Sequence, residues 1–317
     1  MWVAAVRMSK PGQAYHGIAE LTPGGQARWT SELVTVPGKL DEPLRWKRPR
    51  LIFVNSMSDL FHPKLTWDQI DAVVGMMALA DWHTYQVLTK RPDRMAAYLD
   101  GLATRPSIVA AVLNGKALQD PDYPLTPDYP RSVVGQRGLW PLGNVWWGTS
   151  MGLMEAAAER RPAVLRCRPH AKVLWLSIEP LLEDISRELF HYLPRETEIS
   201  QTASHYYQGI DWAVIGGESA TLGGKPRPMH PDWVRNAGRL LDRYGVPWQF
   251  KQWGDWTPHE PVGGYFPVHE FPDGVTVWRV GKDAAGRELD GQIIHQWPHG
   301  FAGPGAEVEG AGHVRTK

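Results

Sequence analysis

The chain has almost no cysteine, no long apolar run and no net charge. A single cysteine among 317 residues excludes an internal disulfide and fits a reducing compartment, so we expect a cytoplasmic protein. No apolar run approaches the roughly 20 residues that span a bilayer, so we expect no membrane partner. The 34 basic and 34 acidic residues cancel, which argues against a global electrostatic surface for nucleic acid. A local basic groove remains compatible with this balance.

Six short apolar runs recur along the chain, and each ends in polar residues or glycine. Each run is rich in β-branched or aromatic residues, which is typical of buried strands. Segments with helical periodicity lie between most of them, at 66–80, 91–102, 152–165 and 230–245. The runs are "LIFVN" (51–55), "TYQVLT" (84–89), "NVWWGTS" (144–150), "KVLWLSIEP" (172–180), "DWAVIGGES" (211–219) and "PWQFKQWG" (247–254).

This alternation predicts an α/β fold with a mostly parallel sheet. A barrel-like (β/α) arrangement and an open doubly wound sheet both fit the pattern. In either fold, ligands bind at the carboxyl ends of the strands, where every one of these runs turns polar. We assign residues 1–254 to this unit, with a Pro/Tyr-rich insertion near 103–143. Residues 255–317 are assigned to a C-terminal extension, with a β-hairpin predicted around 274–291.

The predicted pocket is made of residues that follow the strands. Some have a simpler reading: the polar cluster after the first run also fits a helix cap and an Asx-turn. We favour the pocket, because four polar side chains exceed what one cap requires. The predicted residues are Asn55, Ser56, Asp59, His62, Lys90, Arg91, Thr149, Ser177, Glu179, Gly216, Gly217, Glu218, Ser219, Arg227, His230, Lys251 and Gln252.

Within this set, the residue types suggest different roles. Lys90 and Arg91 precede a predicted helix and suit a phosphate or carboxylate, although they also fit a solvated charge pair. Glu179 is a candidate base, ligand or partner for arginine. Gly216 and Gly217 allow a ligand to approach the backbone closely. The stretch "GGESATLGGKPRPMH" matches neither the Rossmann nor the P-loop fingerprint.

The end of the last run suggests ring stacking. In "FKQWGDW", Lys251 and Gln252 stand beside two tryptophans, and this combination can stack on and hydrogen-bond a ring or a base. We predict no metal site, because the chain has no H-E-x-x-H motif and no cysteine pair. Cys167 lies before a strand and is interpreted as structural.

Seven segments taken in order resemble the phage Gp-thirty-seven/Gp-sixty-eight family, a domain of unknown function. The similarity covers residues 40–293. The segments are "PLRWKRPRLIFVNSMSDLFH", "TYQVLTKRPDRM", "LGNVWWGTS", "LSIEPLLEDI", "DWAVIGGES", "RPMHPDWVR" and "PWQFKQWGDW".

The resemblance implies a fold and two cofactors. Members of this family look like distant relatives of radical S-adenosylmethionine enzymes, which implies a partial (β/α) TIM-like barrel. Three cysteines ending in Cys-Tyr-Ala, in a loop after the first strand, suit a [4Fe–4S] cluster with an open iron site. This chain lacks that triad, although "MWVAAVRMSKPGQAYHG" is similar to the helix that follows it. We therefore expect either a truncated start or a member without a cluster. We favour truncation, because loss of the first strand exposes a sheet edge.

Two functional hypotheses follow. The first is a radical S-adenosylmethionine-like barrel, without its cluster in this chain, that binds a small-molecule or nucleotide-like ligand at the strand ends. In it the glycines and polar groups hold S-adenosylmethionine, and Lys90, Arg227 and Lys251 hold an anionic substrate. The second is a non-catalytic module that binds nucleotides or nucleic acid. The oligomeric state is not indicated.

Overall fold

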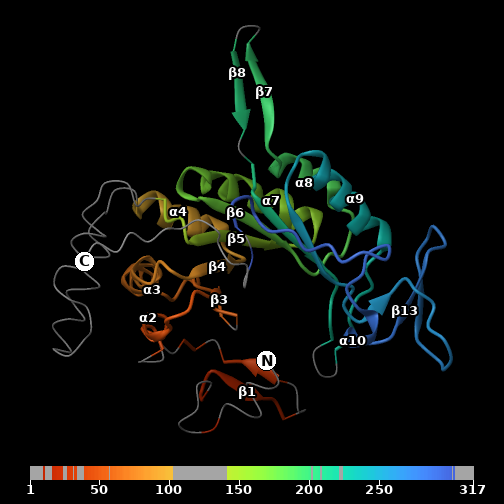
Figure 1. Cartoon of the computed structure of the whole chain (residues 1–317). Helices are drawn as coiled ribbons and strands as arrows, with labels where there is room; N and C mark the ends of the chain where they lie inside the picture. The colour runs from red at the N-terminus through yellow and green to blue at the C-terminus, as the bar shows by residue number, and fades with distance from the viewer. Residues whose placement is uncertain are drawn as a thin grey trace.

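A six-stranded parallel sheet forms the centre of the computed structural model (Figure 1). The structure describes residues 10, 16–23, 27–30, 32–33, 39–56, 58–102, 141–200, 203–207, 209–220, 224–301 and 303. In spatial order, the strands are β3 (Leu51–Val54), β4 (Thr84–Thr89), β5 (Val145–Met151), β6 (Val173–Ile178), β9 (Trp212–Gly216) and β10 (Trp248–Gln252). All neighbouring pairs are parallel. Each of the six apolar runs therefore forms one strand.

The strands follow one another across the sheet in chain order, so the chain winds in one direction only. Right-handed crossovers that never reverse place all the connecting helices on one face, and the sheet curls away from them. Figure 1 shows the helices on this convex side. The four longest helices of the described residues are α3 (Trp67–Leu79), α4 (Pro92–Leu102), α7 (Met154–Arg166) and α9 (Pro231–Arg243). The fold is an α/β half-barrel, and the doubly wound alternative is excluded because it requires a reversal of strand order.

Local sequence signals explain where two of these helices begin. Thr66 precedes α3 and forms a capping box with Gln69: the Gln69 N–H donates to the Thr66 hydroxyl, and the Thr66 N–H donates to the Gln69 side chain. The ring of His230 caps α9, because its Nδ1 accepts the Asp232 N–H at 3.0 Å. Pro231 follows at the first helical position, where its missing N–H costs nothing.

The sheet is apolar on both faces, but the two faces pack against different partners. On the convex face, alternate residues such as Val145, Trp147, Leu174 and Leu176 join the main core under the helices. On the concave face, Trp146, Trp175, Trp212 and Val214 form a second cluster. The three tryptophans lie in the amino-terminal half of their strands, and Val214 lies at the middle of β9. We call this second cluster, with Trp297 and Phe301, the tryptophan floor.

The C-terminal segment completes the tryptophan floor. His295 forms an antiparallel bridge with Gln249, so this segment runs along the outer edge of β10. The indole N–H of Trp212 donates to the Gln296 carbonyl at 2.9 Å. The rings of Trp297 and Trp212 stack with centroids 5.5 Å apart. Residues assigned to a separate extension therefore pack directly on the sheet, while the domain boundary at 254 stays a prediction.

Smaller elements surround the half-barrel. Within the described residues there are three antiparallel units: β1 (Ala19–Leu21) with β2 (Ala27–Trp29), the projecting β7 (Arg195–Ser200) with β8 (Ala203–Tyr207), and the sheet of β11 (Trp256–Thr257), β13 (Thr276–Arg279) and β12 (Val268–Glu270) (Figure 1). The short helices are α2 (Glu42–Arg45), α8 (Ser186–Leu189), α10 (Lys282–Ala285) and the 3-10 turns at Arg168–His170 and Phe190–Tyr192. Where the hairpin around 274–291 was expected, β13 pairs instead with β12, which precedes it.

Several predictions fall on parts of the chain outside the described residues. Residues 103–140 of the predicted insertion lie outside them, as do residues 1–9 and 11–15 of the segment compared with the first helix. Within the described residues, β3 is an edge strand with no strand beyond it. The loss of a first strand stays a prediction. Among the residues that the structure covers, no helix is long and apolar enough to span a membrane.

Candidate functional site

The carboxyl-terminal half of the concave face is polar, in contrast to the tryptophan floor below it. Ser177 and Glu179 continue the inward-facing series of Val173 and Trp175 on β6. Gly216 continues the series of Trp212 and Val214 on β9. The sequence therefore changes from large aromatic residues to small and polar ones along the same face of each strand.

Glu179 is the centre of this polar surface. Its carboxylate accepts hydrogen bonds from Lys251 Nζ at 2.8 Å and from Gln252 Nε2 at 3.1 Å. The Gln252 side-chain oxygen in turn accepts the Ser219 hydroxyl at 3.1 Å. A Cβ on Gly216 would stand 3.1 Å from the Glu179 carboxylate, so only glycine leaves this group its full space. Five predicted residues, Glu179 among them, thus gather at the ends of three strands.

On β5, the residue that faces this polar surface is Ser150 and not the predicted Thr149. Thr149 has the same orientation as Trp147 and Met151, toward the helices, and its hydroxyl donates to the Thr89 carbonyl at 2.9 Å. Ser150 has the orientation of Trp146 and faces the concave side. Side chains alternate between the two faces of a strand, so counting in steps of two from Trp146, which lies on the concave face, reaches Ser150 and not Thr149.

Ser150 and Ser177 are neighbours in register on the concave face. Both residues are buried, and within the part of the chain that the structure describes neither hydroxyl has a hydrogen-bond partner. Neither hydroxyl oxygen is among the buried unpartnered atoms of the described residues, so both reach solvent on the concave face. The pair is therefore accessible to a polar group of a ligand.

Lys90 and Arg91 point in different directions. Lys90 lies two positions beyond the concave residue Leu88 and is exposed. Arg91 instead donates to the Asp59 carboxylate at 2.6 Å. Of the two predicted anion-binding groups, only Lys90 extends from the polar end of the concave face without a protein partner among the described residues.

Asp59 ties the loops after β3 and β4 together. Its carboxylate accepts the Thr89 hydroxyl at 2.7 Å, the Phe61 N–H at 2.9 Å, the Lys90 N–H at 3.3 Å and the Arg91 guanidinium. Every acceptor position is used, so Asp59 organises these loops from within.

The other predicted residues after β3 lie in the turn around Asp59. Asn55 has φ +60°, a left-handed conformation that asparagine tolerates, and its carbonyl accepts the Ser58 N–H at 3.0 Å. Ser56 is exposed. His62 Nδ1 accepts the Lys64 N–H at 3.2 Å. Partial burial lowers the pKa of His62, and the positive charge of Arg91 lowers it further.

Gly217 serves a close approach between two backbone segments. A Cβ at this position would lie 1.9 Å from the Trp253 carbonyl oxygen. Gly254, at φ +83°, is equally restricted from the other side, because its Cβ would lie 2.3 Å from the Glu218 carbonyl. Gly217, which the sequence suggested as a ligand contact, therefore lets the chain after β9 lie against the chain after β10, together with Gly254.

Glu218 and Arg227 form a closed pair beside this junction. The Arg227 side chain donates at 2.7 and 2.9 Å, and its backbone N–H donates at 2.7 Å. These bonds hold the pKa of Glu218 below its ordinary value of 4.5. Arg227 is thus already engaged by a carboxylate. His230, the cap of α9, donates from Nε2 to Asp273 at 3.0 Å and is buried, so it too is occupied.

This pair predicts an acid-sensitive contribution to stability. Because the pKa of Glu218 is lower in the folded chain, its stabilising effect is present above pH 4.5 and is lost as the pH falls through the folded pKa. We expect Glu218→Gln to be less stable than wild type at pH 7, with the gap narrowing below about pH 4. Urea unfolding at both pH values measures this. Glu260→Gln, at an exposed position, is the control, and a gap that is constant with pH would contradict the prediction.

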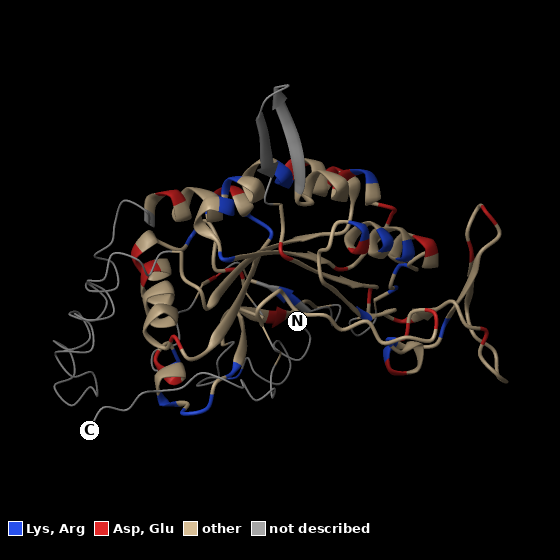
Figure 2. Cartoon of the chain, turned by 45° about the horizontal axis from the view of Figure 1, so that its top comes forward, with Lys and Arg blue, Asp and Glu red and all other residues tan. Residues whose placement is uncertain are grey.

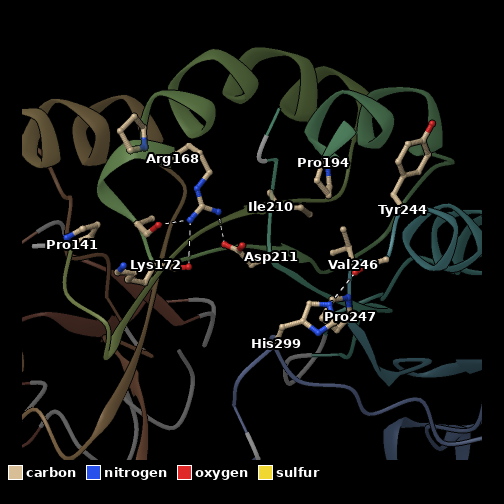
Figure 3. A pocket seen from close by; sticks show the side chains of 13 residues that line it. Pro141, Arg168, Lys172, Pro194, Ile210, Asp211, Tyr244, Val246, Pro247 and His299 are labelled. Atoms are coloured by element: carbon tan, nitrogen blue, oxygen red, sulfur yellow. Dashed lines mark hydrogen bonds and ion pairs between the residues drawn. The ribbon is translucent and has the colours of Figure 1, made fainter. Parts of the chain in front are cut away.

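A cavity of about 570 Å³ lies at the opposite end of the sheet (Figure 3). Arg168, Lys172, Asp211 and His299 line it together with several prolines. The Arg168 guanidinium spans the cavity to Asp211 and to the carbonyls of Ala171 and Gly209. Burial raises the pKa of Asp211, and Arg168 opposes this effect. Because Arg168 is already bound and the amino-terminal end of such sheets serves stability, we place the candidate site at the other end.

The residues of this chain do not fit an iron–sulfur cluster. The single cysteine, Cys167, is buried at the end of α7 on the helix side of the sheet, and its thiol donates to the Ala163 carbonyl. Burial raises its pKa to about 12, which disfavours the thiolate that binds iron. Among the described residues, no group of three or more His, Cys, Asp or Glu side chains is placed to hold a metal ion.

Comparison with known proteins identifies the family. The family model described as "Protein of unknown function (DUF5131)" matches residues 3–298. Neither the curated proteins nor the solved structures give a match. Since the matched region covers nearly the whole chain, the protein belongs to the DUF5131 family.

Proposed function

We propose that the protein binds a nucleotide-like small molecule at the carboxyl-terminal half of the concave face. The observation that carries this proposal is the change along the concave face from the tryptophan floor to polar residues. We call these residues, Ser150, Ser177 and Glu179 with Lys90 and Lys251 beside them, the polar layer. The tryptophan floor covers the concave face near the amino-terminal ends of the strands. The polar layer lies near the carboxyl-terminal ends, where half-barrels and full barrels bind ligands. The finer interpretation of the fold as a partial TIM-like barrel belongs to the same proposal.

The polar layer suggests how such a ligand is held. Lys90 and Lys251 supply positive charge from opposite sides of the sheet, suited to a phosphate or a carboxylate. Glu179 can accept hydrogen bonds from an amine or a ribose diol. Ser150 and Ser177 add two hydroxyls between them. Lys251 is held by one ion pair with Glu179, which an anionic group of a ligand can replace. Arg227, also predicted to bind an anion, is omitted because Glu218 holds it through three hydrogen bonds.

S-adenosylmethionine is the first ligand to test. It combines an amine, a carboxylate and a ribose, and the likeness to the phage Gp-thirty-seven/Gp-sixty-eight family points to it. The iron–sulfur cluster of radical S-adenosylmethionine enzymes is not part of the proposal, because one cysteine cannot hold it.

Calorimetric titration with S-adenosylmethionine, S-adenosylhomocysteine and ATP tests the proposal. We expect at least one to bind, and Lys251→Met to weaken that binding at least about tenfold, because the variant removes one anion-binding group and the partner of Glu179. Lys282→Met, an exposed lysine on α10, should bind as wild type does. The proposal is wrong if no ligand binds or if the two variants bind equally.

The alternative, a nucleic-acid module that stacks bases on the tryptophans after β10, has less support. Trp253 is buried against Phe250, and its indole N–H donates to the Glu288 carbonyl at 2.8 Å. The indole N–H of Trp256 donates to the Pro226 carbonyl at 2.8 Å. Trp253 in particular offers no free ring face to a base, so stacking at this place is not part of our proposal.

A further inference from the structure

A cluster of positive charge lies far from the proposed ligand site, between α2 and β3. The segment "RWKRPR" (45–50) carries four of the positive charges of a chain whose net charge is zero. All four cations are exposed. In Figure 2 the connection between α2 and β3 is mainly blue, whereas blue and red alternate over the helices.

Three of these cations have no acidic partner among the described residues. Arg45 pairs with Asp41 at 3.1 Å. Within the part of the chain that the structure describes, Lys47, Arg48 and Arg50 have no carboxylate within 4.0 Å. A segment with three uncompensated charges in four residues attracts a polyanion.

The backbone of the segment is held in one conformation by the start of β4. The buried ring of His83 accepts the Arg50 N–H at Nδ1, at 3.1 Å, and donates from Nε2 to the Pro43 carbonyl at 2.9 Å. The Trp82 indole N–H donates to the Trp46 carbonyl at 2.8 Å. Since both ends are fixed, binding a partner here orders little additional backbone.

The side chains also favour a particular class of partner. The Arg50 guanidinium stacks over the Trp46 ring at 4.3 Å, which orients its planar donors outward. Guanidinium groups pair well with phosphate oxygens. A protein partner would be expected to meet an apolar centre within a polar rim, but Trp46 is the one large apolar residue of the segment and Arg50 covers it.

We propose that Lys47, Arg48 and Arg50 form a nucleic-acid-binding surface that contacts the phosphodiester backbone. The surface lies at the amino-terminal end of β3, and the proposed ligand site lies at the carboxyl-terminal ends of the strands. The two proposals therefore stand or fall independently: Lys251→Met, which tests the ligand site, should leave nucleic-acid binding unchanged.

Fluorescence anisotropy with a labelled mixed-sequence DNA, as single strand and as duplex, tests this surface. With three cations on phosphates, we expect log K to fall with log[salt] at a slope of about −2 to −3 between about 50 and 200 mM salt. Replacing Lys47, Arg48 and Arg50 together by alanine should lower the affinity at least about tenfold at the lower salt concentration. The form that binds more tightly identifies the nucleic acid.

The matched control removes three exposed cations elsewhere, by changing Arg187, Lys282 and Arg287 to alanine. Both triple variants should keep the wild-type melting temperature, because all six side chains are on the surface. Equal loss of affinity in the two variants, absence of binding to either DNA form, or equally tight binding of a labelled polyglutamate would each overturn the proposal.

Discussion

Gly217→Ala should lower the melting temperature by at least about 5 °C, because the new methyl group meets backbone rather than a movable side chain. The added Cβ would stand 1.9 Å from the Trp253 carbonyl oxygen, so the chain after β9 and the chain after β10 must separate. Such overpacking costs about 3 kcal/mol. Differential scanning fluorimetry measures the shift.

Gly143→Ala provides the control for this substitution. A Cβ there has nothing within 4 Å, and the backbone does not have positive φ, so we expect a change of less than about 0.5 kcal/mol. Similar melting temperatures for the two alanine variants would show that the junction after β9 and β10 adapts easily. In that case, Gly217 would again be open to interpretation as a ligand contact.

Asp59→Ala should destabilise the chain by about 3 kcal/mol, because it leaves several donors without an acceptor at once. The Thr89 hydroxyl, the Phe61 N–H and the Arg91 guanidinium all bind this carboxylate. The loss should also loosen the chain at Lys90, whose N–H is held by the same group. We therefore expect weaker binding of any ligand that uses Lys90, in addition to the loss of stability.

Asp81→Ala separates these effects from the simple loss of a negative charge. Asp81 is exposed near the start of β4 and should change stability by less than about 0.5 kcal/mol. Chemical denaturation of both variants gives the comparison. If Asp59→Ala were as stable as Asp81→Ala, the network around Asp59 would be a surface feature, and the pocket interpretation of Asp59 would regain weight.

The sheet was predictable because buried parallel strands have a strong local signature. "TYQVLT" forms a strand over the predicted residues 84–89, and the other five runs differ from their strands mainly at the ends. The helix from 66–80 was equally accessible, because Thr66 marks its start by capping chemistry. The sequence did not decide between a half-barrel and a doubly wound sheet, because the order of strands depends on pairing between distant segments.

The orientation of side chains was harder to predict, for a physical reason. A strand buried on both faces has no alternation of apolar and polar residues, so "NVWWGTS" does not indicate that Ser150, rather than the predicted Thr149, faces the concave side. The distinction rests on which tryptophan faces the helices, and that depends on packing. Contacts between distant segments have the same limit. Trp212 stacks on Trp297 and donates to the Gln296 carbonyl, 84 positions further along the chain, and the residues around Trp212 do not indicate either contact.

The partners of two charged side chains could not be predicted from the sequence. Arg91 follows β4 closely, and Arg227 lies in the connection between β9 and α9. It did not indicate that Asp59 and Glu218 bind them, because an ion pair depends on the positions of loops that the sequence pattern does not define. Charges at strand ends therefore predict a polar region more reliably than they predict free binding groups.

The two edges of the sheet, β3 and β10, do not pair with each other within the described residues, and this determines how large a ligand can be. A closed barrel admits its ligand along the axis, and its mouth limits the size. A half-barrel can also be entered from the side: the segment at His295 runs along the β10 edge, but among the described residues no strand lies beyond β3. Its polar half can therefore accept one residue of a longer polymer while the remainder of that polymer stays in solvent. Extended molecules should be tested as ligands alongside free small ones.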